Sequence, residues 1–370
     1  MNFIIIASLI SFFGTFLVMP SVIKLAIKKR ILSPGGGRNA HDGFTPNIGG
    51  IAIFIGLLLS NLFLLGFYIQ EISSESPFLD LDSFHKFLSY IIVTVSCITM
   101  FIVGLSDDLT TLSSKLKFSI QIILAFCLTY YGDIRIESIN GLFGIHDLSY
   151  LVSIIFSMIV VIFIINSFNL TDGLDSLATS LGIYILSSFG ILFLLSNHFY
   201  DATLCFAGVS SLFAFWFYNK PPAKIFMGDS GSLVIGVIIA YSAIKLCNFP
   251  VDTFGTINPV FILCVIAYPS VDTLRVFLVR IFSGNSPFAA DRNHIHHLLV
   301  DKDFNHGWAA FFAVMYSIVL TLICFFLREN VTLSFIVLVS LAILFIVLPM
   351  ASFARSTTKR FLSFFKELIG

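Results

Sequence analysis

The sequence predicts an all-α integral membrane protein with about eleven transmembrane helices, in one polytopic domain over residues 1–370. Three observations lead to this prediction. Of the 370 residues, 57% are hydrophobic and 11% are charged, and the mean hydropathy is +0.98, more apolar surface than a water-soluble fold can bury. The apolar residues gather in runs of membrane-spanning length. The charged residues divide unequally between the two sides that such runs create.

The apolar runs can be counted directly, because crossing about 30 Å of hydrocarbon takes roughly 17 to 25 helical residues. The first run is followed, not preceded, by its basic residues, the reverse of a cleaved signal peptide, so we expect it to remain attached with the N-terminus outside. The fourth and eighth runs are short and could extend at either end. The eleven runs are 3–23, 48–69, 87–105, 118–131, 148–165, 177–195, 202–218, 233–247, 259–278, 308–327 and 333–354.

A formal net charge of zero conceals two opposite biases. Connections after odd-numbered runs share one side, which holds 17 of the 21 Lys and Arg residues and 11 of the 21 acids. The other side holds 4 bases and 10 acids, so the two sides carry +6 and −6. The positive-inside rule therefore predicts a cytoplasmic C-terminus. The neutral total argues against a nucleic-acid partner, and the six scattered cysteines match neither a disulfide framework nor a zinc site.

Unusual polar clusters all fall on the predicted cytoplasmic side, which suggests one site. Asp107 and Asp108 end the third apolar run. Adjacent acids at a helix C-terminus oppose the helix dipole, so either they are a solvated helix end or they bind a cation or a proton. Lys117 follows them and either contacts phosphate or reflects the positive-inside bias.

A second cluster follows the fifth run. Asn166 and Asn169 are three residues apart, as are Asp172 and Asp175, with Gly173 between the acids. On a helix, residues at this spacing share a face, which would form a polar wall for a ligand or metal. The simpler alternative is that Asp172 caps the next helix.

A third cluster, Gly228-Asp229-Ser230-Gly231-Ser232, lies where the eighth run starts. A glycine-flanked helix N-terminus presents free N–H groups that suit phosphate oxygens, and a carboxylate among them can hold Mg²⁺. Hard oxygen ligands favour Mg²⁺ or Mn²⁺ over zinc. Capping of the helix by Asp229 or Ser230 is the competing interpretation.

The last cluster contains His294, His296 and His297, close to Arg292. It lacks the i, i+4 histidine pair and the cysteines typical of zinc sites. The neighbouring cation favours binding of an anion such as a diphosphate, against the alternative of a solvated basic loop. Asp272 and Arg275, three residues apart in the ninth run, are expected to form a structural ion pair.

Taken together, these motifs resemble the polyprenyl-phosphate N-acetylhexosamine-1-phosphate transferase family, in its WecA- and TagO-like branch and related to MraY. The resemblance extends from Arg38 to His297 and includes the Pro46–Gly50 turn and the His-Ile-His-His sequence. Two positions depart from the family pattern. Thr111 stands where some members carry a third acid after the pair, and Ser176 replaces the usual second glycine after Asp175.

The resemblance implies transfer of an N-acetylhexosamine 1-phosphate, by default GlcNAc, from a UDP-sugar to undecaprenyl phosphate, with release of UMP. It implies Mg²⁺, with Mn²⁺ as a substitute, held by Asp229 and Asp172. Asp107, with Asp108 beside it, would orient or deprotonate the lipid phosphate. The remaining residues would bind the substrates. They are Asn166, Asn169, Asp175, Lys117, Arg292, His294, His296 and His297.

These assignments place the protein in the bacterial inner membrane with its site facing the cytoplasm, at the first membrane step of a surface-polysaccharide pathway. The sugar, the pathway, direct or double displacement, and the oligomeric state, with a homodimer as one option, stay open. A transporter of nucleotide sugars or lipids is the alternative, and it would place ionisable residues near mid-membrane. A CDP-alcohol phosphotransferase fits less well, because Asp172-Gly173 is not followed by its Ala-Arg pair.

Overall fold

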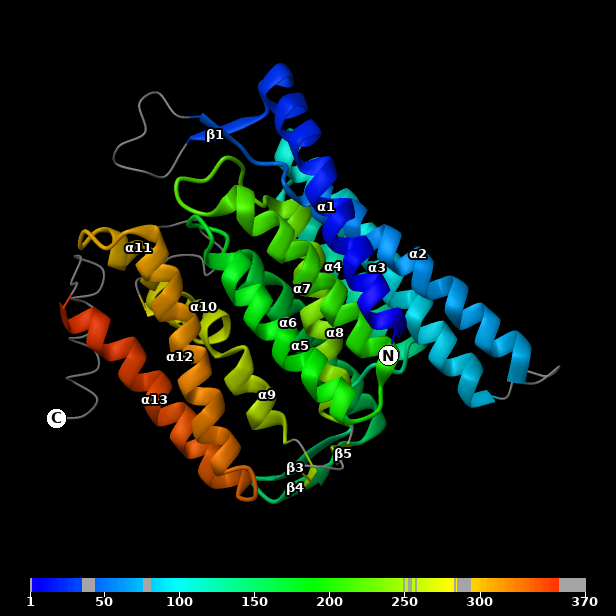
Figure 1. Cartoon of the computed structure of the whole chain (residues 1–370). Helices are drawn as coiled ribbons and strands as arrows, with labels where there is room; N and C mark the ends of the chain where they lie inside the picture. Colours follow the sequence, from blue (N-terminus) through cyan, green and yellow to red (C-terminus); the bar gives the residue numbers. More distant parts are fainter. Residues whose placement is uncertain are drawn as a thin grey trace.

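The computed structural model is a bundle of helices, and three short hairpins join some of them (Figure 1). Residues 2–34, 44–75, 81–248, 250–251, 255–256, 258–282, 284 and 294–352 are described. The helices are α1 (Asn2–Lys29), α2 (Gly50–Glu75), α3 (Leu81–Thr110), α4 (Ser114–Phe126), α5 (Tyr150–Asn169), α6 (Leu177–Leu195), α7 (Phe199–Asn219), α8 (Asp229–Leu246), α9 (Pro259–Val265), α10 (Ala267–Phe282), α11 (Ile295–Val300), α12 (His306–Phe326) and α13 (Val331–Ser352). A π-helical turn, η1 (Cys127–Tyr131), extends α4. The antiparallel hairpins pair β1 (Leu32–Pro34) with β2 (Phe44–Pro46), β3 (Ser138–Leu142) with β4 (Ile145–Asp147), and β5 (Pro250–Val251) with β6 (Gly255–Thr256).

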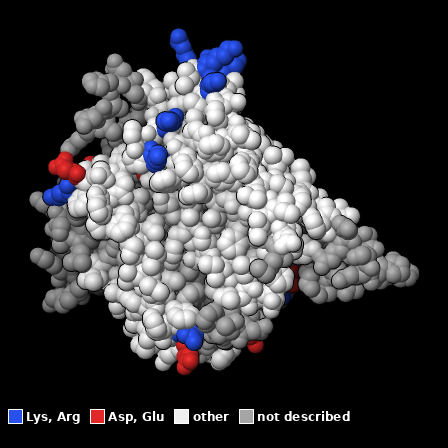
Figure 2. All heavy atoms as spheres, viewed as in Figure 1, with Lys and Arg blue, Asp and Glu red and all other residues white. Residues whose placement is uncertain are grey.

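The prediction of an all-α membrane protein is confirmed. Among the described residues, eight helices are long and apolar enough to cross a membrane, and a ninth span results if the bent pair α9 and α10 is counted as one. Ten of the predicted apolar runs each coincide with one helical segment where they are described, including the short fourth run, on α4 and η1, and the last run, on α13. Figure 2 shows charged residues gathered toward the ends of the molecule, with an uncharged band between them. The count of eleven crossings and the orientation remain predictions.

The ninth predicted span, 259–278, is not one helix. It breaks at Ile266, and α9 and α10 meet at an angle of 85°. Pro269 lies in the first turn of α10, where its missing N–H costs nothing, but its ring would clash with the Val265 carbonyl if the helix were continuous. The proline therefore favours a break at this place.

Helix α8 is the centre of the bundle. Sixteen of its residues are buried, and it packs against α2, α3, α5, α6 and α7, so its sequence is apolar on every side. A Cβ atom on Gly104 of α3 would collide with the backbone of Asp229, which shows how closely α3 approaches the start of α8. This close contact lies at the end of the bundle that carries the polar clusters.

Candidate active site

Lys117 joins two of the predicted clusters. Its Nζ lies 3.0 Å from Asp107 Oδ2 and 3.1 Å from Asp229 Oδ2. Asp107 is near the C-terminal end of α3, Lys117 is in the first turn of α4, and Asp229 begins α8. Asp107 also accepts a hydrogen bond from the Leu112 N–H, 2.6 Å away, which fixes the connection from α3 to α4. One ammonium group thus lies between two carboxylates.

Asp108 has a different contact from its neighbour. Its Oδ1 accepts the Asp229 N–H at 2.9 Å and its Oδ2 accepts the Ser230 N–H at 3.0 Å. These N–H groups belong to the first turn of α8, so a carboxylate from α3 caps another helix, where the dipole favours it. The expectation that these N–H groups are free to bind phosphate is therefore wrong, and neither Asp229 nor Ser230 is the cap. The residue at the cap position itself is Gly228, whose φ of 70° suits glycine.

Asp229 is held from a second side by α5. Asn169 Nδ2 donates to Asp229 Oδ1 at 3.0 Å and to Ser232 Oγ at 2.7 Å. Asn166, one turn earlier, does not reach this group: its Nδ2 donates to Gln121 Oε1 and to the Ile162 carbonyl, both at 2.7 Å. The predicted wall of amides is thus divided, and only Asn169 contacts Asp229.

Asp172 and Asp175 lie in the turn between α5 and α6 and not on a helix face, which corrects the expectation of a shared helical surface. Asp172 Oδ2 accepts the Gly228 N–H at 3.0 Å, so Asp172 does not cap α6. Burial, assisted by the negative charges of Asp229 and Asp108, raises the pKa of Asp172 to about 7. This carboxyl group therefore exchanges its proton near neutral pH.

Asp175 faces a different part of the structure. Its Oδ2 accepts the Ala223 N–H at 3.1 Å, and its Oδ1 lies 3.3 Å from Nδ1 of His306, the first residue of α12. The chain then enters α6 through Ser176, which has a left-handed φ of 63°. That conformation explains why glycine is usual at this position.

The histidine cluster reaches the same turn. A Cβ atom on Gly173 would lie 2.7 Å from His296 Nε2 and 3.2 Å from His297 Nε2, so the glycine allows the two segments to touch. His296 is fully buried, and its Nε2 has no hydrogen-bond partner among the described residues. Burial holds the pKa of His296 well below its usual range despite the nearby Asp272, so the ring is neutral. Arg292 lies outside the described residues.

The histidines are anchored by Asp272, for which only a structural ion pair was expected. The pair exists: Arg275 Nε lies 3.4 Å from Asp272 Oδ1. Asp272 also lies 2.8 Å from His294 Nδ1 through Oδ2 and accepts the Ile295 N–H at 3.0 Å. The spacing within α10 predicts the contact of Asp272 with Arg275. The contacts with His294 and Ile295 depend on the direction that α10 takes after the bend at Ile266.

The first polar turn completes the site. Gly49 N–H and Gly50 N–H donate to the carbonyls of Phe226 and Met227 at 3.0 and 2.8 Å, and Phe226 N–H donates to the Pro46 carbonyl at 2.8 Å. The Pro46–Gly50 turn thus pairs with the segment that leads into Gly228. The clusters meet at one end of the bundle, as predicted. His41, Asp42 and Gly43 lie outside the described residues.

Two kinds of metal-binding chemistry are present. Asp107, Asp172 and Asp229 offer hard oxygen donors, and a cationic side chain already lies between two of them, so the donor set fits Mg²⁺ or Mn²⁺. Among the described residues, a compact trio of metal-binding side chains is formed instead by Asp272, His294 and His296, within 4.8 Å. There the carboxylate already accepts from Arg275 and Ile295, so hydrogen bonding accounts for its geometry.

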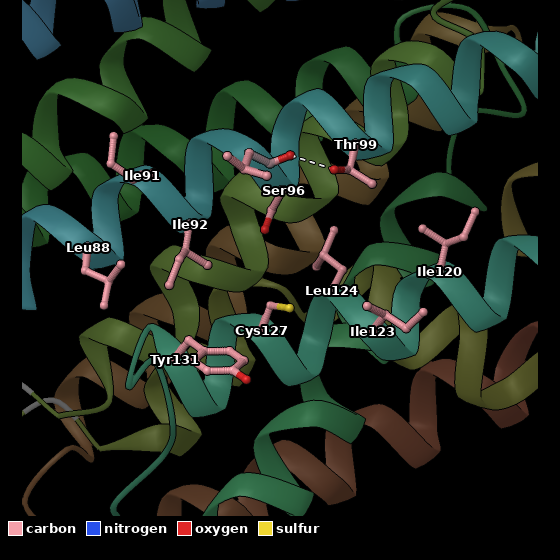
Figure 3. Close-up of a pocket in the computed structure, with 11 residues that line it drawn as sticks. Leu88, Ile91, Ile92, Ser96, Thr99, Ile120, Ile123, Leu124, Cys127 and Tyr131 are labelled. Carbon is pink, nitrogen blue, oxygen red and sulfur yellow. Dashed lines mark hydrogen bonds between the residues drawn. The ribbon is translucent and has the colours of Figure 1, made fainter.

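A groove between α3 and the α4–η1 segment has a volume of about 410 Å³ (Figure 3). Its lining is almost entirely apolar and includes Leu88, Ile92, Ile123 and Leu124. No charged side chain lines it, so it cannot hold a nucleotide diphosphate.

Comparisons with known proteins identify a matching family model and similar transferases. Residues 90–247, which carry Asp107, Asp172 and Asp229, match the model of glycosyl transferase family 4. The chain is 27% identical to a Bacillus subtilis (strain 168) protein named "Probable undecaprenyl-phosphate N-acetylglucosaminyl 1-phosphate transferase", over 99% of this chain and 97% of that protein.

Two enterobacterial relatives are named "Undecaprenyl-phosphate alpha-N-acetylglucosaminyl 1-phosphate transferase". The chain is 28% identical to the one from Yersinia pestis and 26% identical to the one from Escherichia coli (strain K12). Both alignments cover 76% of this chain and 72% of the relative. The chain is thus similar, over most of its length, to proteins named as undecaprenyl-phosphate N-acetylglucosaminyl 1-phosphate transferases.

Proposed function

We propose that the protein transfers GlcNAc 1-phosphate from UDP-GlcNAc to undecaprenyl phosphate and releases UMP. The observation that carries this proposal is the union of Asp107, Lys117, Asp229 and the Asp172 turn in one polar site at the end of an apolar bundle. A lipid phosphate and a soluble nucleotide sugar can meet only at such a membrane surface. The names of the relatives support the sugar phosphate and the acceptor.

In the reaction, an oxygen of the lipid phosphate attacks the donor phosphorus that carries the sugar. A new P–O bond forms, and the bond from that phosphorus to the bridging oxygen breaks, so UMP leaves with that oxygen. The acceptor needs little help from a base, because a phosphate monoester with a second pKa of about 6 is mostly dianionic at pH 7. The main barrier is the approach of two anions.

The charged side chains of the site can lower that barrier. Lys117 provides a cation between Asp107 and Asp229, and Asp107, beside it, would orient the acceptor. Asp229 and Asp172 would hold Mg²⁺, with Asn169 fixing Asp229. When bound, the metal would neutralise phosphate charge. Both oxygens of Asp108 are occupied by the start of α8, which favours a supporting role for it.

The orientation follows from the charge distribution. The side that carries the polar clusters has the excess of Lys and Arg, which predicts that it faces the cytoplasm, where UDP-sugars are made available. This places the protein in the inner membrane of a bacterium. A transporter is not favoured, because the polar clusters lie at helix ends and the described spans are continuous apart from the break at Ile266.

The test uses purified protein with undecaprenyl phosphate, Mg²⁺ and radiolabelled UDP-GlcNAc or UDP-GalNAc. We expect a lipid-linked product and an equal amount of UMP, with GlcNAc preferred. Asp229→Asn should abolish the product. Asp201→Asn serves as the matched control, because Asp201 is a buried aspartate in α7 that pairs with Lys245 of α8 outside the site. Absence of a lipid-linked product from every UDP-sugar would refute the proposal.

A further inference from the structure

Asp272 is a buried carboxylate on α10, and an ion pair alone does not account for all its contacts. Its side chain is 2% exposed. Oδ1 accepts from Arg275 at 3.4 Å and from the Ile295 N–H at 3.0 Å, while Oδ2 lies 2.8 Å from His294 Nδ1. A charge in such a place is costly unless every acceptor is used. Here both oxygens are used, and one serves a histidine.

The contact with His294 fixes the state of that ring. A carboxylate can only accept, so the proton must be on His294 Nδ1. Within the described part of the chain, the hydrogen bond of the His294 ring is the one formed by Nδ1, so Nε2 is the atom that remains for a ligand. A carboxylate bonded to one nitrogen of a functional histidine is a common way to fix the tautomer and orientation of the other nitrogen.

The position of His294 links this contact to the substrate site. The His294 and His296 rings stack with centroids 5.4 Å apart, and His296 Nε2 faces Gly173 in the turn that carries Asp172. At its other ring nitrogen, His296 contacts Tyr268, whose Oη lies 3.4 Å from Nδ1. Asp272 also caps α11 through Ile295. The Asp272 carboxylate therefore fixes both the first turn of α11, which carries His296 and His297, and the orientation of the His294 ring just before that helix.

We propose that Asp272 is a positioning residue that holds His294 by Nδ1, so that Nε2 accepts a hydrogen bond from a hydroxyl group of the sugar-nucleotide donor. This inference rests on the proposed function. It predicts that Asp272 acts on donor binding through His294 and not through the acceptor. Asp272→Asn should weaken donor binding because its amide N–H, placed opposite Nδ1, would force the opposite tautomer.

The experiment measures the dissociation constant of UDP-GlcNAc by calorimetry with purified full-length protein and Mg²⁺. No acceptor is added, so no turnover occurs. The four proteins are wild type, Asp272→Asn, His294→Gln and the double variant. We expect each single variant to weaken binding about tenfold or more, as for other residues that support a functional histidine. The double variant should be no weaker than His294→Gln alone, because Asp272 acts through that ring.

Two further comparisons separate positioning from folding. Asp272→Glu, which keeps the carboxylate, should recover part of the affinity. Asp201→Asn should leave the dissociation constant unchanged. If Asp272→Asn does not fold, the variant Asp272→Asn/Arg275→Gln removes both charges of the buried ion pair together. It should give the same loss, and again no further loss with His294→Gln.

The outcomes are distinct. Unchanged donor binding in Asp272→Asn, or losses that multiply in the double variant, would overturn the positioning role. Wild-type protein that binds UDP-GlcNAc and shows the non-additive pattern, but forms no lipid-linked product, would refute the transferase proposal and leave the positioning role standing. Wild-type protein that binds no UDP-sugar at all would overturn both.

Discussion

At the scale of single residues, Lys117 occupies a place that a divalent cation would also favour. Its Nζ lies between Asp107 and Asp229 at 3.0 and 3.1 Å, and the second oxygen of Asp229 is taken by Asn169. A metal ion that binds Asp229 must therefore compete with the ammonium group or displace it. Displacement would release Lys117 to contact a phosphate.

This competition gives a prediction. Lys117→Met removes one positive charge beside the carboxylates, so it should tighten Mn²⁺ binding at least tenfold, since charges a few ångströms apart in a partly buried site interact by several kcal/mol (about 4 at 4 Å). Transferase activity should fall at the same time. Electron paramagnetic resonance would measure free Mn²⁺ without substrates. Lys115→Met, at the exposed lysine two residues earlier, is the control. Equal or weaker Mn²⁺ binding in Lys117→Met would contradict the prediction.

We expect the ionised Asp172 side chain to lower the free energy of unfolding of the protein, even though the proposed function needs it. Because burial raises its pKa to about 7, the folded protein binds this proton more tightly than the unfolded chain, whose aspartate has a pKa near 3.9. Stability is therefore lost as pH rises from about 4 to about 7 and stays low above that. Asn keeps an acceptor for the Gly228 N–H and has no such cost.

We expect Asp172→Asn to be inactive but more stable than wild type without divalent cations. One pKa unit corresponds to about 1.4 kcal/mol, so its advantage should grow by about that amount from pH 6 to pH 8. Thermal unfolding in detergent at both pH values measures this. Added Mg²⁺ should reduce the difference, because it stabilises the wild type. A constant difference across pH would show that the carboxyl group does not titrate near 7.

The sequence predicts which residues meet but not all of their contacts. Asp107, Asp229 and Lys117 could be assigned to one site because each lies at a helix end on the same side. Asp108 and Asp272 could not be understood in this way. Each accepts at least one backbone N–H group of another helix, and no spacing within one segment reveals which helix end a carboxylate reaches.

At the scale of elements, two adjacent aspartates at the end of α3 should separate into a stability role and an activity role. Asp108 satisfies two N–H groups at the start of α8. Asp108→Ala leaves both unpaired and should lower the free energy of unfolding by about 1–3 kcal/mol. Asp107→Asn keeps an acceptor for Leu112 and should mainly reduce turnover. Unfolding temperatures and rates of the two variants, measured side by side, check this. Similar stability loss in both would be evidence against the division.

The helices themselves were predicted well and their interruptions less well. Apolar runs give the positions of α1 to α8, because a helix in a membrane must be apolar over its length. The same criterion passes through 259–278 without showing the 85° bend. Pro269 marks the place, but its effect depends on whether neighbouring elements stabilise the break. The Tyr268 N–H donates to Ser317 Oγ of α12 at 3.2 Å, a contact that the sequence alone does not show.

At the scale of the whole molecule, the division of charge orders the two ends of the bundle. The zero net charge separates into +6 and −6 by predicted side, and the polar site lies at the basic end. This division predicts an orientation that packing cannot supply, because the helices would pack identically in either direction.

The orientation can be tested by thiol labelling of whole cells and of inside-out vesicles with a membrane-impermeant maleimide. Lys115→Cys introduces an exposed thiol in the first turn of α4, beside the site, and Asp147→Cys places one on β4 at the other end of the bundle (Figure 1). Cys127→Ser removes the one native thiol that is not buried. Because the basic end should face the cytoplasm, we expect the Lys115→Cys thiol to react only in inside-out vesicles and the Asp147→Cys thiol only in whole cells. The reverse pattern would place the site outside, away from any cytoplasmic UDP-sugar, and would refute the proposed donor as well as the orientation.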